Sequence, residues 1–366
     1  FATLNVVDLL VDDDLTVTDD VAIGGALAVT GDYSSATSGT SNLRLGVNAG
    51  NSIASGGNYN VVVGDEAGTA LTTGDGNVAV GYQALKTEDA NGESTALGYR
   101  ALMTQNAGAA AYNVAVGYDT GLDLTTGVRN TLLGTFAGSN ITSGGSNVAI
   151  GYNSLGTEDG HGFNTAVGYQ ALKFLNAGAD AYNVAVGYQA GVAVTTGIDN
   201  VLIGGLAGDA LTDADMNVAV GKNALGSDTL GSMSVAIGNG SLTTQNFTTA
   251  TNTYNIGIGQ GAGSSITTGV RHTIIGGLAG DAFTDGGNNV ALGYRALTTE
   301  TGGSASVAIG SLSLENQNTN NVNYNTAVGY GSGQSVTTGV ENTLIGGLAG
   351  DALTDADYNV AVGKDS

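Results

Sequence analysis

A nine-residue phrase, Asn-Val-Ala-Val-Gly-Tyr-x-Ala-Gly/Leu, recurs nineteen times between Asn42 and Ser366. Fifteen of the nineteen opening residues are Asn, and the residue four places later is Gly in every repeat. In the first complete group of repeats these structural turn glycines are Gly81, Gly98, Gly117 and Gly134. A short hydrophobic phrase at nearly constant spacing is typical of stacked proteins in which each repeat buries its neighbour. The sequence therefore predicts one elongated repetitive domain.

The repeats fall into groups of four. Nearly identical units begin at Asn77, Asn147, Asn217, Asn289 and Asn359, so a group spans about 70 residues. The eighth residue after the opening residue is Leu in the first two members of a group and Gly in the other two. Extra residues always enter after the second member. The groups therefore predict a second, longer period in the fold.

Each phrase has the pattern of a β-strand, because branched residues alternate with Ala at a period of two. The constant Gly ends the strand, where the backbone adopts a conformation barred to other residues or approaches another segment closely. The residue seven places after the opening is always Ala, Ser or Thr, which predicts a crowded corner. A second short extended segment, such as residues 124–126, would complete the unit. We expect an all-β, repetitive parallel β-solenoid over residues 42–366, with two strands and two turns in each of nineteen coils.

The opening Asn residues allow two compatible interpretations. Identical amides stacked at the strand spacing can hydrogen-bond along the axis as a ladder. Alternatively, each Asn caps only its own turn, as Asn does well.

Several repeats resemble known proteins. The segments at 183–191, 234–238 and 306–310 are similar to the head repeats of trimeric autotransporter adhesins, and residues 164–172 resemble repeats common in bacteriophage tail fibres. The adhesin resemblance implies a left-handed parallel β-roll, three chains side by side and a role in attachment. It covers residues 42–366, although the adhesin repeat is typically shorter than the repeats of this chain.

The N-terminal part differs from the repeats. Residues 1–32 carry short strand-like segments every 10 to 12 residues and are similar to the interwoven shaft segments of phage fibres. Residues 33–41 are rich in Ser, Thr and Gly and are predicted to be a linker.

Composition excludes several classes of function. Nine Lys and Arg residues against 32 Asp and Glu residues give a formal charge of −23, whereas phosphate binding needs clustered basic residues. No stretch approaches the roughly 20 apolar residues of a membrane helix. We therefore expect neither nucleic-acid binding nor membrane insertion.

Catalytic chemistry has little support. The chain has no Cys and only two His residues, His161 and His272. Glycan-cleaving fibres use paired carboxylates, and the pairs at 88–89 and 158–159 recur at the same turn of successive groups. We interpret Glu88 and Glu158 as parts of solvated acidic turns, and we expect no enzymatic activity.

Two Asp clusters occupy corresponding turns. Their members are Asp209, Asp213 and Asp215 in one turn, and Asp351, Asp355 and Asp357 in the other. Oxygen ligands at alternating positions suit Ca²⁺, but the turns lack the EF-hand pattern and the Gly-Gly-x-Gly-x-Asp motif. The sequence leaves open a calcium site and a water-exposed turn without any cofactor.

Four Tyr residues end the longer loops that follow the second member of each group. They are Tyr112, Tyr182, Tyr254 and Tyr324. Exposed aromatic residues beside Asn and Gln make good contacts with carbohydrate or protein. The alternative is that these side chains fill the groove between neighbouring chains.

Together these features predict a side-by-side or interwoven homotrimeric fibre. The resemblance implies the trimer, and a coil this thin buries little surface alone. We expect the shaft of a phage tail fibre in the virion, with a host-surface glycan or protein and other tail proteins as partners. Alternatives are a bacterial trimeric surface adhesin, which would be extracellular, and a polysaccharide-degrading tail spike.

Overall fold

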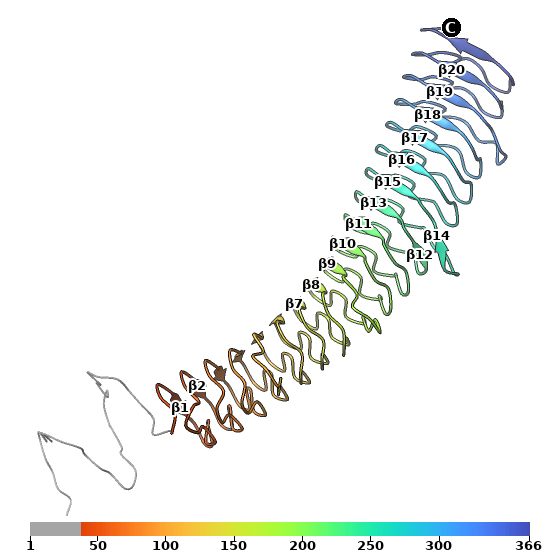
Figure 1. The fold of residues 1–366 in the computed structure, drawn as a ribbon. Helices are drawn as coiled ribbons and strands as arrows, with labels where there is room; N and C mark the ends of the chain where they lie inside the picture. The colour runs from red at the N-terminus through yellow and green to blue at the C-terminus, as the bar shows by residue number, and fades with distance from the viewer. Residues whose placement is uncertain (1–37) are drawn as a thin grey trace, which may run out of the picture. The chain divides into compact units, whose positions relative to one another are not determined.

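The structure is a computed structural model that describes residues 38–366. The predicted shaft segment at 1–32, and the linker at 33–41 apart from its last four residues, lie outside the described residues. Residues 38–366 are all-β and contain no helix, hence no helix that could span a bilayer. Their coils stack into a curved parallel β-solenoid of about nineteen turns (Figure 1). The predicted fold class is thus confirmed, and the trimer stays a prediction.

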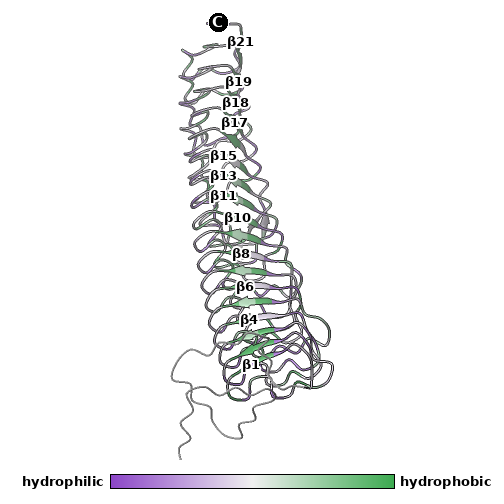
Figure 2. Ribbon diagram, turned by 90° about the vertical axis from the view of Figure 1, so that its left-hand side faces the viewer, coloured by the Kyte–Doolittle hydropathy of each residue, from purple (hydrophilic) through white to green (hydrophobic). Residues whose placement is uncertain are grey.

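Each repeat contributes one three-residue strand to a single parallel sheet (Figure 2). The strands are β1 (Leu43–Leu45), β2 (Val61–Val63), β3 (Val78–Val80), β4 (Thr95–Leu97), β5 (Val114–Val116), β6 (Thr131–Leu133), β7 (Val148–Ile150), β8 (Thr165–Val167), β9 (Val184–Val186), β10 (Val201–Ile203), β11 (Val218–Val220), β13 (Val235–Ile237), β15 (Ile256–Ile258), β16 (Thr273–Ile275), β17 (Val290–Leu292), β18 (Val307–Ile309), β19 (Thr326–Val328), β20 (Thr343–Ile345) and β21 (Val360–Val362). Each strand pairs with the next one of this sheet in register, as Val61 does with Val78. Identical repeat positions therefore stack in columns along the axis.

The prediction of a second regular strand in each coil is wrong. Residues 124–126 form no strand, since 125 and 126 are bends, and the only additional strand pair in the described chain is β12 (Gly231–Ser232) with β14 (Thr251–Asn252). The backbone N–H groups of Thr125, Thr126 and Gly127 all point at the carbonyl of Thr142, at 2.8, 3.2 and 3.3 Å. A regular ladder needs evenly spaced partners, so this converging geometry joins the coils without forming a strand.

We number repeat positions from the opening residue as position 0. The Ala at position 2 and the small residue at position 7 point inward, and Ala79 and Ala84 are fully buried. In the first two coils of a group, Leu at position 8 fills the remaining interior. In the other two coils, position 8 is Gly and a large apolar residue at position 11 takes the space. A Cβ on Gly138 would lie 2.8 Å from Ile141 Cδ1, which explains why these two positions change together.

The opening Asn residues serve both of their predicted roles. The N–H of Asn77 donates to Asn60 Oδ1 (2.9 Å), and Asn60 donates through Nδ2 to the carbonyl of Gly74 at the end of its own coil (2.8 Å). The ladder therefore runs mainly from side-chain oxygen to backbone N–H, while the amide nitrogen closes the turn. Asn60 and Asn77 are buried, so these two hydrogen bonds satisfy a backbone N–H and a backbone carbonyl that water does not reach.

Position 4 requires Gly for two reasons. All nineteen glycines at this position have φ between 124° and 143°, a region that strongly favours Gly. A Cβ at Gly81 would also lie 2.3 Å from the carbonyl oxygen of Gly98 in the next coil. Gly81, Gly98, Gly117 and Gly134 belong to this glycine column, which sets how closely the coils approach.

Candidate interaction surface

The outward side of the sheet and its two flanks form a strip of exposed apolar residues. We call positions −1, 1, 3 and 5 of all described repeats the outer strip. Among the described residues, the large hydrophobic side chains left exposed lie on these four columns, with three exceptions: Phe174, Leu278 and Val322. The solenoid therefore concentrates its exposed apolar surface instead of scattering it, and a concentrated patch is typical of an interaction site.

Position 3 is the most uniform part of the outer strip. It is Val, Ile or Leu in all nineteen repeats. Leu97, Leu133 and Ile345 are exposed by 44%, 45% and 41%, although a strand apolar on both faces is usually covered on both. Within one chain the inward face is covered and the outward face is open.

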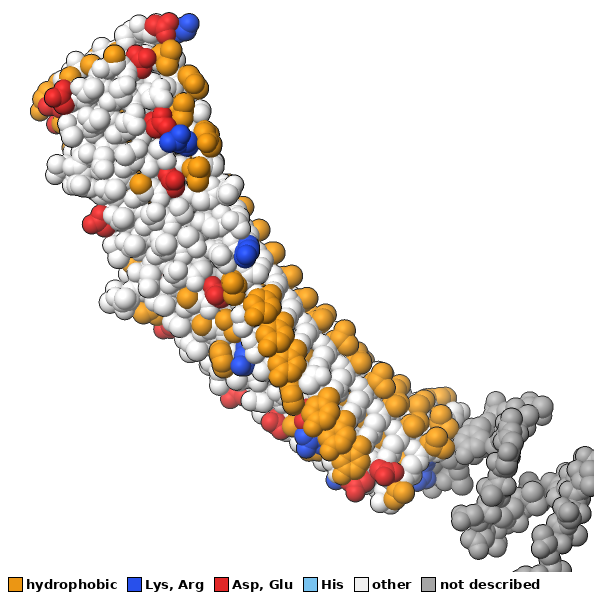
Figure 3. All heavy atoms as spheres, turned by 180° about the vertical axis from the view of Figure 1, so that it is seen from behind, with side chains coloured by type: hydrophobic (Ala, Val, Ile, Leu, Met, Phe, Trp, Pro, Cys, Tyr) orange, Lys and Arg blue, Asp and Glu red, His pale blue; other side chains and the backbone are white. Residues whose placement is uncertain are grey.

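A file of stacked aromatic side chains runs beside the strands. Its members are Tyr82, Tyr99, Tyr118, Phe136, Tyr152, Tyr169 and Tyr188, with neighbouring ring centroids 5.0 to 6.1 Å apart. Figure 3 shows this file next to a second file of aliphatic side chains, with the glycine backbone between them. The Tyr–Tyr pairs stack face to face, with ring planes within 24° of parallel. A partner would meet an aromatic ring in each of these seven coils, with the Phe136 ring nearly perpendicular to both of its neighbours.

The four Tyr residues predicted as contact residues all occupy position −1 of the outer strip. They are Tyr112, Tyr182, Tyr254 and Tyr324, and 52% to 63% of each is exposed. All four have positive φ, near 50°, which is uncommon for a bulky residue and holds them in one backbone conformation. Tyr182 stacks on Phe163 with centroids 5.0 Å apart. The structure therefore places these residues beside the sheet, and their role in contacts stays a prediction.

Tyr112 also lines a surface cavity of about 310 Å³ together with Asp75, Asn91 and Glu93. The hydrogen bond to Glu93 and the charge of that carboxylate raise the pKa of the Tyr112 hydroxyl. The cavity thus combines an aromatic ring with several oxygen acceptors.

The interpretation of Glu88 and Glu158 as solvated acids is wrong. Both occupy position 11 of the first coil in a group and are fully buried, as are Asp228 and Glu300 at the same position of the next two groups. The neighbouring residues Asp89 and Asp159 are exposed. The carboxylate takes the interior place that an apolar residue occupies in most other coils, so each group contains one buried acid.

Three of these four acids have a shared set of partners. Gln105 donates through Nε2 to Glu88 Oε2 (2.9 Å) and to Ser94 Oγ (3.0 Å), while Asn113 Nδ2 donates to Gln105 Oε1 (2.9 Å). Corresponding contacts join Gln245 to Asp228 and Gln317 to Glu300. In these three groups an amide donor, and no basic residue, contacts the buried carboxylate, although Oε1 of Glu88 has no partner. Sequence inspection missed these Gln residues, although a Gln at position 11 of the second coil recurs in these three groups.

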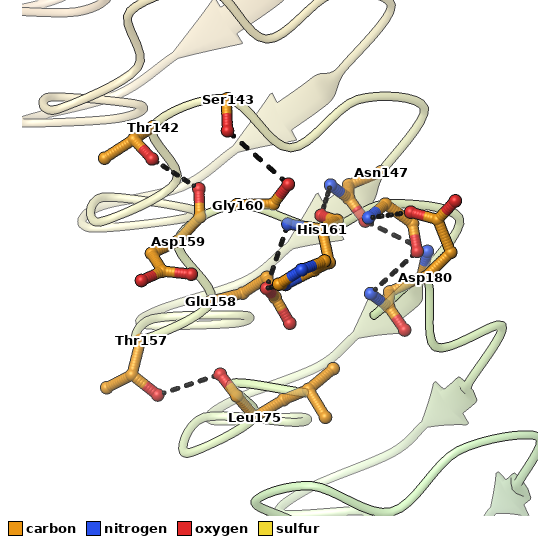
Figure 4. A network of polar contacts seen from close by, with 12 residues as sticks. Thr142, Ser143, Asn147, Thr157, Glu158, Asp159, Gly160, His161, Leu175 and Asp180 are labelled. Carbon is orange, nitrogen blue, oxygen red and sulfur yellow. Dashed lines mark hydrogen bonds and ion pairs between the residues drawn. The ribbon is translucent and has the colours of Figure 1, made fainter. Parts of the chain in front are cut away.

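The second group departs from this pattern. Leu175 stands where the other groups have Gln, and Asn164 stands where they have Ser. Glu158 instead lies beside His161, with Oε1 3.4 Å from Nδ1, and accepts the backbone N–H of His161 (Figure 4). Burial raises the pKa of the Glu158 carboxyl, while the amides of His161 and Ala177 and the imidazole oppose the rise. Asp159 comes from the same turn and completes a group of three side chains whose ligand atoms lie within 4.8 Å of one another.

The Asp clusters proposed for calcium are not gathered in this way. Among the described residues, the Glu158 group is the only set of three acidic or His side chains within such reach. Asp213 accepts the hydroxyl of Thr196 (2.5 Å), and Asp215 accepts the backbone N–H of Ile198 (2.9 Å). Asp357 likewise accepts the N–H of Val340. The carboxylates of Asp213, Asp215 and Asp357 thus join neighbouring coils. Calcium binding by the two Asp clusters, which also include Asp209, Asp351 and Asp355, stays a prediction.

Comparison with known proteins adds no relative. No protein-family model matches the chain, and no curated protein matches it significantly.

Proposed function

We propose that residues 42–366 form the shaft of a homotrimeric attachment fibre, with a phage tail fibre as the preferred assignment. The shaft would be a non-enzymatic spacer and adhesion element in the virion, with other tail proteins and a host-surface glycan or protein as partners. The observation that supports this proposal best is the outer strip, which runs along every described coil.

A second copy of this chain is the partner that fits the outer strip. The strip repeats once per coil over nineteen coils, and only a partner of equal length and equal repeat can cover it at every level. Burying the exposed part of a position-3 side chain contributes roughly 0.5 to 1 kcal/mol. Nineteen such positions give on the order of 10 to 20 kcal/mol per chain, which is comparable to or above the cost of association. Lateral assembly of identical rods is therefore energetically sufficient.

The mass of the particle in solution tests the trimer. Light scattering after size exclusion should give about 108 kDa, three times the 36.0 kDa of one chain. Replacing Ile203 and Ile237 together by Lys puts two charges per chain on the strip and should lower the mass to that of one chain, with an unchanged circular dichroism spectrum. Phe174→Lys alters an exposed apolar residue outside the strip and should leave the trimer intact. A 36 kDa mass for the unaltered chain would refute the proposal.

The location of the chain, on the virus tail or on the bacterial surface, distinguishes a tail fibre from a surface adhesin. Antibodies against the chain should label the tails of virus particles in electron micrographs if it is a tail fibre. Labelling of the bacterial surface instead would favour the alternative, a trimeric surface adhesin.

The polysaccharide-degrading alternative is disfavoured by burial. The carboxylates that recur in the turns, such as Glu88 and Glu300, are fully buried, so a polysaccharide cannot reach them. Release of reducing ends from host polysaccharide by the purified chain would contradict our non-enzymatic assignment.

A further inference from the structure

We propose that Glu158, Asp159 and His161 form a binding site for one divalent transition-metal ion of the Zn²⁺ type. The proposal concerns one turn of the solenoid and does not depend on the fibre function. Carboxylate oxygen and imidazole nitrogen are the ligands that Zn²⁺ uses together with Cys sulfur. Water would complete the coordination on the exposed side.

Two buried atoms in this turn lack hydrogen-bond partners. They are Oε2 of Glu158 and Nδ1 of His161. The Glu158 side chain is fully buried, and a buried polar group without a partner costs free energy. A metal ion bound by both oxygens of the Glu158 carboxylate and by Nδ1 of His161 would give each of these atoms a partner.

The spacing of the two side chains fits a metal better than a hydrogen bond. Glu158 Oε1 and His161 Nδ1 are 3.4 Å apart, and no hydrogen bond forms between them. Four-coordinate Zn²⁺ with bonds of about 2.1 Å holds neighbouring ligand atoms about 3.4 Å apart. The Asp159 carboxylate is exposed, and one of its oxygens lies within 4.8 Å of the ligand atoms of both residues, so we assign it as the third protein ligand. Because 30% of the His161 side chain is exposed, the ion can enter from solvent.

The other three groups show what this turn looks like without the site. Their buried acids each accept a hydrogen bond from Gln105, Gln245 or Gln317, and position 14 is Asn or Gly. Only the second group has lost the Gln and gained a His at position 14. Glu88 also has one oxygen without a partner, yet it belongs to no group of three acidic or His side chains among the described residues. The change in the second group is thus a coordinated replacement of an amide donor by a metal ligand.

Calorimetric titration of the tag-free, EDTA-treated full chain with ZnCl₂ tests the proposal. We expect one ion per chain with a Kd in the micromolar range or below, and a higher melting temperature with zinc. His161→Asn and Glu158→Gln should each weaken binding by at least about tenfold. His161→Asn places Asn where the first group already has Asn91, so the fold should persist, and circular dichroism checks this.

Matched controls locate the ion. Glu88→Gln alters the equivalent buried acid, and His272→Asn removes the other His, so both should bind zinc as the unaltered chain does. Co²⁺ added in place of Zn²⁺ should give the visible absorption of a four-coordinate site, and His161→Asn should abolish it. No zinc binding by the unaltered chain would overturn the proposal and leave a simple imidazole–carboxylate pair. Zinc binding that His161→Asn leaves unchanged would overturn it as well.

Discussion

Replacing Asn200 by Ala should remove one link of the buried Asn ladder. Asn200 is fully buried, its Oδ1 accepts the N–H of Asn217 (3.0 Å), and its Nδ2 donates to the carbonyl of Ala214 (2.8 Å). Ala leaves both backbone groups without these partners in a place that water does not reach. At about 1 to 3 kcal/mol for each unsatisfied group, the free energy of unfolding should fall by about 2 to 6 kcal/mol.

Urea unfolding at pH 7 and equal protein concentration measures the total loss. Stacked repeats need not unfold in one step, so hydrogen exchange at the amide of Asn217 supplies the local measurement and should accelerate strongly. Asn140→Ala alters an exposed Asn whose side chain accepts a surface hydrogen bond from Ser139, and should change little. Asn200→Ser should behave like Asn200→Ala. All three coils that open with Ser have Gln at position 11, which donates to the Ser hydroxyl, whereas this coil has Leu211 there. A loss below about 1 kcal/mol with unchanged exchange at Asn217 would refute the ladder argument.

Two further predictions concern the column of glycines at position 4 and the column of opening residues at position 0. Gly187 has φ 143°, and Gly187→Ala places a Cβ 2.5 Å from the carbonyl oxygen of Gly204. This change should lower the free energy of unfolding by at least about 2 kcal/mol. Gly205→Ala has open space around it and should be nearly neutral in the same urea experiment. Burial lowers the pKa of His272 to about 4, against the opposing effect of its hydrogen bond to Gly286, so the unfolded chain binds the proton more readily. Stability should therefore fall by roughly 3 kcal/mol as the pH drops from about 6.5 to about 4. His272→Asn should remove this part of the pH dependence, and equal slopes for the two chains would contradict it.

The regular features of the coil could be predicted because they recur at fixed spacing. The Asn and Gly columns and the small residue at position 7 each have one local cause, which repetition makes visible. Even the exception is regular, since His272 uses its ring to reach Gly286 as Asn60 uses its amide to reach Gly74.

The features that sequence inspection missed depend on contacts between coils. Buried carboxylates are rare, so Glu88 was assigned to solvent, and its partner Gln105 lies 17 residues away in the next coil. The second strand was predicted from the apolar and Thr residues at 124–126, but side-chain pattern does not reveal that three N–H groups converge on one carbonyl. The outer strip was missed because period-two alternation shows that two faces differ, without showing which of them faces inward.

The aromatic file gives the chain an internal optical reporter. The chain has fifteen Tyr residues and no Trp, so Tyr alone determines its near-ultraviolet emission. Rings stacked as closely as Tyr82, Tyr99 and Tyr118 exchange excitation energy, so their emission depends on the stacking. The tyrosine emission should change when the coils separate, even where the strands are too short to give a strong circular dichroism signal. Tyrosine fluorescence can thus follow the stacking of coils in the unlabelled chain.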